Sequence, residues 1–441
     1  MAAKLISVVL ALFTALTNFL GLFVRVPKIE PDAGSFKPVL RFTVASDVHI
    51  KSYNDVRSRR MAKMLKTSYA IAQADKYYKN LDGVLFAGDS ADSGLAFQFY
   101  TFQSVLNANL RKGTQPMVIV AKSHDCGTYK KDALSFYETL SGLTTDYHYV
   151  LNGFHFIGIS TTHDKETDAK YTQTQLEWLD KQLALAAAGD PGKPIFVAHH
   201  EHVANTVYGS REALGEGWGT PEFTAIFSKY PQIIDFSGHS HYPLNDPRSI
   251  WQGDFTAVGT ASLNYFEFTV DDVRTVHPDN YQNAAQMWIV EADAANRVRL
   301  RGYDLISGTT VCEYMIEKPS DKSTFAYTPE KMAESSSSPV FNSGAALTVS
   351  KKADCTYKID IPAAKSTDGK IIFLYRVYVC DKNGNPLNNF WELSGYYFVP
   401  APETVSVNIG KLGKGDYILK AVAENAYGMQ SEPVTASLTV K

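Results

Sequence analysis

The chain has 441 residues, 45% of them hydrophobic and 20% charged, so it is long enough for two or three packed domains and is not disordered by composition. Its formal net charge of −3 is close to neutral for this length, so no nucleic-acid-binding surface is evident and no general attraction to anionic lipid follows. The four cysteines show no CxxC spacing, which gives thiolate zinc and thioredoxin-like motifs little support. Because the net charge is close to neutral, any phosphate binding must depend on a local group of residues.

The first element in chain order is an uncharged apolar stretch, residues 5–24, with Lys4 before it and Arg25 and Lys28 after it. Such a stretch can span a bilayer as a helix, and it exceeds the roughly 7 to 15 residues of a cleaved signal's apolar core. We predict that residues 1–36 are a signal peptide or an N-terminal membrane anchor, and that the protein is extracytoplasmic, either secreted or membrane-anchored. No clear small-x-small cleavage site follows, so cleavage and anchoring both stay open.

Residues 37–316 alternate short apolar strands with helical stretches such as residues 54–80 and 171–189, which is the order of an α/β domain. Each strand runs apolar and then reaches a polar or glycine-rich end. The predicted strands are VLRFTVAS (39–46), DGVLFAG (82–88), PMVIVAK (116–122), FHFIGIS (154–160), KPIFVAHH (193–200) and QIIDFSGHSH (232–241).

The composition changes after this domain. Residues 317–339 are rich in Ser, Pro and charge, which indicates a linker. Residues 340–441 contain alternating strands separated by turns and no convincing helix, which predicts a small all-β sandwich. This last segment resembles fibronectin type III and immunoglobulin-like domains, in which Leu412 and Tyr417 would form the tyrosine corner.

The polar residues at the strand ends carry the chemistry. In an α/β fold the strand ends converge on one rim, so residues distant in sequence can meet in one pocket. A mixed set of carboxylates and imidazoles suits Mn, Fe, Zn or Co better than calcium. The residues are Asp47, His49, Asp89, Asp92, Ser123, His124, Asp125, His199, His200, His239 and His241.

The order of these motifs (DVH, GDSAD, SHD, HH and GHSH) resembles the calcineurin-like metallophosphoesterase superfamily, whose signature reads DxH, GDxxD, GNHD, a strand-end His and GHxH. The resemblance covers roughly residues 39–303. It implies an α/β fold in which a β-sandwich is flanked by helices (αββα), followed here by the small all-β domain. A purple acid phosphatase is less favoured, because the tyrosine that those enzymes place after the bridging Asp is missing from GDSADSG.

The resemblance also implies a centre of two divalent or trivalent transition metals, Mn, Fe or Zn, which holds a hydroxide that attacks a phosphate mono- or diester in line. The first metal would be bound by Asp47, His49, Asp89 and His241. The second would share Asp89 and add His199 and His239. His124 would contact the phosphoryl oxygen or the leaving group, and Asp125 would orient it.

Ser123 departs from the family pattern, which has an asparagine there as a ligand of the second metal. A serine hydroxyl is a poor neutral donor, so the second site is expected to bind more weakly. His200 and Arg211 are further candidates for contact with the substrate. The leading prediction is thus an exported metal-dependent phosphoesterase. The alternative is a degenerate protein of the same fold that keeps one metal and acts as a binding or surface module. The oligomeric state is left open.

Overall fold

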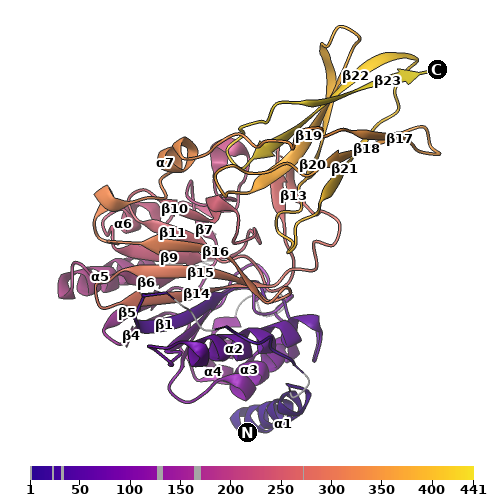
Figure 1. The fold of residues 1–441 in the computed structure, drawn as a ribbon. Coiled ribbons are helices and arrows are strands. Elements are labelled where there is room, and N and C mark those ends of the chain that lie inside the picture. Colours follow the sequence, from indigo (N-terminus) through magenta and orange to yellow (C-terminus); the bar gives the residue numbers. More distant parts are fainter. Residues whose placement is uncertain (1, 22–23, 31–33, 127–132, 163–169, 272) are drawn as a thin grey trace. The chain divides into compact units, whose positions relative to one another are not determined.

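The computed structural model describes residues 2–21, 24–30, 34–126, 133–162, 170–271 and 273–441. The chain is a mixed α/β protein with several sheets (Figure 1). It divides into two compact units. Unit 1 comprises Met1–Leu244 and Ser249–Thr328, and unit 2 comprises Asn245–Arg248 and Pro329–Lys441.

The first six-stranded sheet of unit 1 has the order β16-β15-β14-β1-β2-β3. Strands β1, β2 and β3 run parallel, whereas β14 pairs antiparallel with β1, β15 with β14, and β16 with β15. Helices α2, α3 and α4 pack their apolar residues against one face of this sheet. The bounds are β1 Pro38–Ala45, β2 Gly83–Ala87, β3 Gln115–Ile119, β14 Gln286–Asp293, β15 Val298–Asp304, β16 Thr309–Ile316, α2 Val56–Ala74, α3 Ala96–Asn109 and α4 Ala133–Ser141.

The second six-stranded sheet has the order β10-β11-β9-β6-β5-β4. Strands β5, β6, β9 and β11 run parallel, and helices α5 and α6 pack on one face. The bounds are β4 Tyr147–Leu151, β5 Phe154–Gly158, β6 Ile195–Ala198, β9 Ile233–Ser237, β10 Ile250–Gln252, β11 Thr256–Gly259, α5 Gln173–Gly189 and α6 Thr224–Phe227. Shorter strands are β7 His202–Val203, β8 Gly219–Thr220, β12 Phe268–Val270 and β13 Val273–Val276.

The two sheets share one apolar core. The ring of Phe42 on β1 meets those of Phe156, Phe196 and Phe236 edge-on, at centroid distances of 4.9, 4.7 and 5.9 Å. Side chains alternate along β6, because successive residues of a strand point to opposite faces. Phe196 therefore faces the core between the sheets, while its neighbours Ile195 and Val197 face α5 and α6.

Helix α1 (Ala2–Gly21) is the apolar helix expected from the sequence. Residues Lys4–Gly21 are long and apolar enough to cross a membrane, and they lie near the N-terminus. One side of α1 packs on unit 1, where the ring of Phe13 lies 5.3 Å from that of Tyr53. The side chains of Leu5 and Leu12 are each 66% exposed. Residues 1, 22, 23 and 31–33 of the predicted leader lie outside the described residues.

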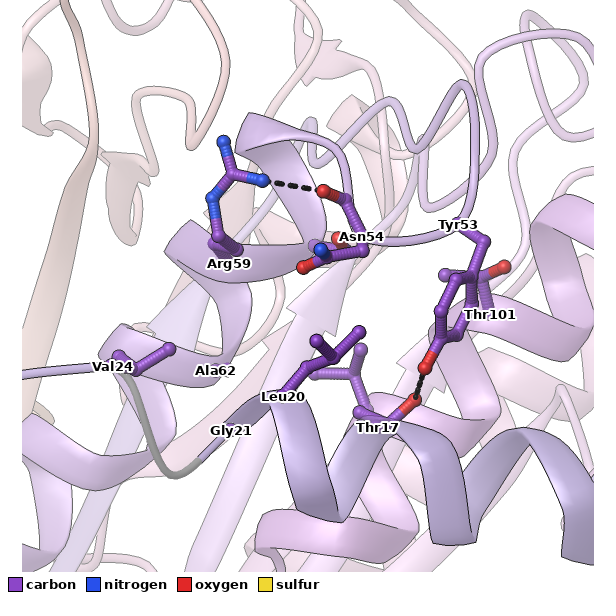
Figure 2. A pocket seen from close by; sticks show the side chains of 11 residues that line it. Thr17, Leu20, Gly21, Val24, Tyr53, Asn54, Arg59, Ala62 and Thr101 are labelled. Atoms are coloured by element: carbon purple, nitrogen blue, oxygen red, sulfur yellow. Dashed lines mark hydrogen bonds between the residues drawn. The ribbon is translucent and has the colours of Figure 1, made fainter.

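A pocket lies between α1 and the start of α2 (Figure 2). Figure 2 shows the hydroxyl of Thr17 on α1 pointing at the hydroxyl of Tyr53, 3.4 Å away. Leu20 and Val24 border the same pocket, and its lining includes none of the strand-end Asp and His residues. This pocket is therefore separate from the candidate metal residues.

Unit 2 contains two antiparallel sheets, β17-β18-β21 and β20-β19-β22-β23, which share one apolar core. The hydroxyl of Tyr417 donates to the carbonyl of Gly413 at 3.0 Å, and Leu412 packs against the core. The fibronectin type III assignment stays a prediction. The bounds are β17 Thr348–Lys351, β18 Tyr357–Pro362, β19 Ile372–Cys380, β20 Pro386–Leu393, β21 Thr404–Ile409, β22 Gly415–Asn425 and β23 Val434–Val440.

The segment predicted as a linker, residues 317–339, is divided between the two units. Its first part packs in unit 1, where Phe325 is buried and the carbonyl of Tyr327 accepts a hydrogen bond from the amide of Gln252 at 3.0 Å. Its second part includes helix α7 (Pro329–Glu334) in unit 2, where Lys370 Nζ donates to the carbonyl of Met332 at 2.9 Å. The change of unit falls between Thr328 and Pro329.

Candidate metal centre

The polar residues that follow the strands meet in one cluster. Three overlapping groups have ligand atoms within 4.8 Å of one another. The residues come from the loops after β1, β2, β3, β6 and β9, because parallel strands bring their carboxyl ends to one edge of a sheet. The groups are Asp47, His49 and His241; His49, Asp89 and His124; and Asp89, His200 and His239.

We call Asp47, His49 and His241 the first pole of this cluster. His241 Nε2 lies 3.0 Å from Asp47 Oδ1 and 3.2 Å from His49 Nε2. His49 Nε2 also lies 3.7 Å from Asp47 Oδ1 and 3.9 Å from Asp89 Oδ2. All of these side chains are buried. Donor atoms of several side chains thus converge on a common point, as ligands of one ion do.

We call Asp89, His200 and His239 the second pole. His200 Nε2 lies 3.2 Å from Asp89 Oδ2. His200 Nδ1 lies 2.8 Å from the carbonyl oxygen of Ala87, which can only accept, so Nδ1 carries the proton of this bond. A backbone carbonyl that holds one ring nitrogen directs the other toward an ion, as is usual for metal-binding histidines.

The structure differs from the sequence prediction at His199. His199 belongs to none of the three groups found among the described residues, and His200 takes the place expected for it. His199 Nε2 lies 2.9 Å from Asp235 Oδ1, and its ring lies 4.6 Å from that of Phe223. The reason is the alternation along β6: His199 continues the face of Val197, toward the helices, and His200 continues the face of Phe196.

Two features of the cluster suit bound metal ions. First, Asp47 Oδ1 and His200 Nε2 are buried and make no hydrogen bond within the part of the chain that the structure describes. Short distances without hydrogen-bond geometry fit side chains that are directed at an ion rather than at each other. The oxygen and nitrogen donors also suit a transition metal.

Second, the backbone is in the left-handed region at the cluster residues. This region is uncommon for residues other than glycine, and such strain gathers at functional sites. The five φ angles are Asp47 52°, His49 49°, Asp89 51°, His239 71° and His241 58°.

The Asp and His side chains of the cluster shift one another's pKa values. Burial would raise the pKa of Asp47, but the ring of His241 holds it well below its usual value. Burial would likewise raise the pKa of Asp89, and His200 lowers it instead. Burial disfavours protonated His200, yet Asp89 raises the pKa of His200 to about 10. Burial, with help from the charge on His200, lowers the pKa of His239 to about 3. His239 is thus neutral, the form that binds metals.

His124 lies at the exposed side of the cluster. Its Nδ1 lies 2.7 Å from the carbonyl oxygen of Asp92, so this nitrogen carries a proton. Its ring stands edge-on to that of His49, with centroids 4.4 Å apart. His124 also forms one of the three groups with His49 and Asp89. The bond to Asp92 therefore leaves Nε2 as the nitrogen available for chemistry.

Asp125 does not orient His124, contrary to the sequence prediction. Its two carboxylate oxygens accept hydrogen bonds from the amides of Ala91 at 2.8 Å and Ala121 at 3.0 Å. Asp125 is fully buried, and burial together with the charge of Asp89 raises the pKa of Asp125 to about 7. Because these amides belong to different loops, Asp125 links the loop after β2 to the loop after β3.

Ser123 lies against the carboxylate that the groups share. Its hydroxyl donates to Asp89 Oδ1 at 2.6 Å, and the amide of His124 approaches the same oxygen at 3.3 Å. The side chain is therefore at the cluster, as expected, but its hydroxyl hydrogen is directed at Asp89.

Arg211, predicted as a candidate for contact with the substrate, pairs with Glu216 in its own loop. Its Nε lies 2.9 Å from Glu216 Oε2, and this buried carboxylate also accepts from the amides of Gly209 and Arg211. No described contact joins its guanidinium to the cluster. Because Arg211 and Glu216 pair within one loop, Arg211 braces that loop.

Several residues around the cluster support its side chains. A side chain at Gly88 would meet the ring of His200, and one at Gly238 would meet Asp47. The ring of His202 is buried between two serine hydroxyls, at 2.8 Å from Ser237 and 2.6 Å from Ser240. The spacing of the GHSH motif could have identified Ser240 as a residue whose side chain points away from the cluster.

Comparisons with known proteins add little to this geometry. No family model and no curated protein matches the chain. Similar solved structures include one described as GAP50, the anchor in the inner membrane complex of Plasmodium, with 12% identity and a TM-score of 0.43 over 66% of this chain and 96% of that one.

Two others are a purple acid phosphatase from yellow lupin and PhoD. The lupin enzyme has 14% identity and a TM-score of 0.43 over 64% of this chain and 54% of that one. PhoD has 11% identity and a TM-score of 0.41 over 68% of this chain and 72% of that one. These values leave the functional conclusion to the geometry of the cluster.

Proposed function

We propose that the protein is an exported metal-dependent phosphoesterase of the calcineurin-like metallophosphoesterase fold, which hydrolyses phosphate mono- or diesters at a dinuclear centre. The observation that carries the proposal is the overlap of the groups through Asp89, which belongs both to a group with His49 and to a group with His200 and His239. A carboxylate shared in this way can bridge two ions.

The two poles would hold one ion each. Asp47, His49 and His241 would bind the first, His200 and His239 would bind the second, and Asp89 would bridge them. When bound, such a pair of ions supplies an activated water and neutralises charge on the phosphoryl group. The residues themselves orient the donors: the Ala87 carbonyl fixes the ring of His200, and Gly88 and Gly238 leave room for His200 and Asp47.

His124 would assist the departure of the leaving group. Its Nδ1 proton is held by the Asp92 carbonyl, so the protonated ring can donate only from Nε2, the nitrogen left for the cluster side. A proton from Nε2 would go to the leaving oxygen as the phosphorus–oxygen bond breaks. The exposure of this ring leaves it open to a substrate.

A degenerate protein that keeps one ion is the second candidate. The observation that favours it is the hydroxyl of Ser123, which donates to Asp89 rather than offering an extra donor to the second pole. In that case the protein would bind a phosphate ester without hydrolysing it. Metal content and turnover separate the two candidates.

Export would depend on the N-terminal helix. Residues Lys4–Gly21 are apolar and long enough for a signal or an anchor, and this supports an extracytoplasmic location. The phosphate ester itself is the partner that the cluster fits. We place the specificity of the enzyme in the loops around the cluster.

The test is a metal titration of the purified protein combined with hydrolysis of an aryl phosphate. We expect one to two Mn, Fe or Zn ions per chain, and loss of hydrolysis on chelation that is restored by added metal. His148→Ala is a matched control, because His148 bonds to Gln182 and His155 and belongs to none of the three groups. Tight metal binding without turnover would favour the degenerate candidate, and no metal binding would refute both.

A further inference from the structure

Three rings form a continuous surface beside the first pole, which we call the aromatic shelf: Tyr265, His277 and Tyr281. The ring of Tyr265 lies 4.1 Å from that of His241. Tyr265 in turn meets His277 at 5.6 Å and Tyr281 at 5.7 Å, both nearly perpendicular at 83°. His277 and Tyr281 are stacked at 4.3 Å with an interplanar angle of 16°. The shelf thus extends outward from the candidate metal residues.

The shelf is held in place rather than loosely exposed. His277 Nε2 lies 2.9 Å from the carboxylate of Glu267, a buried residue. The carbonyl of Tyr281 accepts from the amide of Phe266 at 2.9 Å, and the amide of Tyr281 donates to the carbonyl of Pro278 at 3.0 Å. The side chain of His277 nevertheless keeps 36% of its surface exposed. A rigid ring surface that meets solvent costs little to order when a flat ligand binds it.

An open depression of about 410 Å³ is lined by Tyr281 of the shelf and by its neighbours Asn280, Gln282 and Asn283. The side-chain amides of Asn and Gln offer both donors and acceptors. Such a mixture matches the edge of a nucleobase, whose face stacks on aromatic rings. A sugar phosphate without a base has no flat face to stack on the rings, so it would gain less from this surface than a nucleotide.

We infer that the aromatic shelf and its depression bind the base of a nucleotide, so that a nucleoside phosphate is the substrate class of this site. The inference rests on the proposed function, because the phosphoryl group would lie at the cluster while the base lies on Tyr281 and His277. The three rings connect these two places without interruption, and this continuity identifies the occupant of the shelf as part of the substrate.

The test compares adenosine 5′-monophosphate with ribose 5-phosphate on the metal-loaded full chain. The two share the same leaving oxygen, so the ratio of their kcat/KM values reports the base alone. We expect the nucleotide to be favoured by about 10-fold or more, mainly through KM, since a stacked base commonly contributes this much. Tyr281→Leu and His277→Ala should each bring the ratio closer to one, and Tyr281→Phe should preserve it.

Tyr77→Leu is the control, because Tyr77 is 43% exposed and has no contact with the shelf among its described neighbours. It should leave the ratio unchanged. A ratio near one in the wild type, or a high ratio that neither Tyr281→Leu nor His277→Ala lowers, would overturn the inference while the phosphoesterase proposal stands. If neither compound is hydrolysed while an aryl phosphate is, the inference fails and the phosphoesterase proposal stands. If none of the three is hydrolysed, the proposed function fails. Calorimetric binding of the same pair then decides the inference, since equal affinities would refute it.

Discussion

The two poles of the cluster differ in how they are built. At the first pole, Asp47, His49 and His241 come from two loops, and their donor atoms lie within 3.7 Å of one another. At the second pole, the only carboxylate is Asp89, which the adjoining group of His49 and His124 also uses. Ser123 adds a hydrogen bond to that carboxylate instead of a further donor. The second pole therefore depends for its carboxylate on Asp89, which the adjoining group also uses.

Replacement of Asp89 should have the largest effect, because metal binding at both poles depends on the charge of its carboxylate. In Asp89→Asn we expect both metal-binding steps to weaken and turnover to fall to the metal-free background. Elemental analysis and an aryl phosphate assay measure the two effects. Asp92→Asn is the control, since His124 bonds to the backbone carbonyl of Asp92 and not to its carboxylate. Two retained ions in Asp89→Asn would show that Asp89 does not bridge.

Replacement of His124 would separate chemistry from metal binding. Because we assign it to proton transfer, His124→Ala should lower kcat by roughly 10² to 10⁴ fold while both ions remain bound. The measurement is turnover at saturating metal, alongside metal content. The effect should shrink for a substrate whose leaving group needs no proton. Equal losses for good and poor leaving groups would remove His124 from that role.

Adjacent histidines sharpen the contrast at the second pole. His200→Ala should weaken the second metal-binding step by at least about 100-fold, since outer contacts alone contribute 10- to 100-fold. His199→Ala should keep both ions but destabilise the fold by about 3 to 5 kcal/mol, because it leaves the buried Asp235 carboxylate without its partner.

Isothermal titration with metal and urea unfolding measure these two outcomes in the same pair of variants. Loss of the second ion in His199→Ala, with retention in His200→Ala, would restore the ligand set first expected from the sequence.

The smallest effect is expected at Ser123. An asparagine there could supply the neutral oxygen that the second pole lacks, so Ser123→Asn should tighten the second binding step several-fold and raise activity at limiting metal. The first step should change less, because Asp47, His49 and His241 belong to the loops after β1 and β9. Ser123→Ala is a useful companion, since it removes the bond to Asp89 without adding a donor. An unchanged second step in Ser123→Asn would mean that another group completes the pole.

The sequence predicted which residues lie close together, because the ends of the strands can be recognised in it. Apolar runs that stop at Asp47, Asp89 and His239 mark the carboxyl ends of parallel strands, and parallel strands bring such ends together. The order of the motifs then assigned these residues to a first and a second metal. The sequence prediction took His199 where the structure groups His200, because the outcome depends on which face of β6 each residue continues. That face follows from the alternation of Phe196 and Val197, which the sequence also contains.

Other features were beyond sequence reasoning. The orientation of Asp125 depends on the amides of Ala91 and Ala121, and these belong to two loops whose distance is set by the pairing of β2 with β3. The pairing of Arg211 with Glu216 depends on a turn that no periodic pattern announces. Aromatic residues near the first pole carry no motif, so the shelf becomes visible only when the chain is folded.

The left-handed backbone at Asp47, His49, Asp89, His239 and His241 has a consequence for how stability is distributed in unit 1. Each such residue costs roughly 1 to 3 kcal/mol, and the surrounding sheets must bear that cost. Ions that bind only the folded arrangement return part of it through mass action. Metal binding at the cluster would therefore be expected to raise the free energy of unfolding of unit 1.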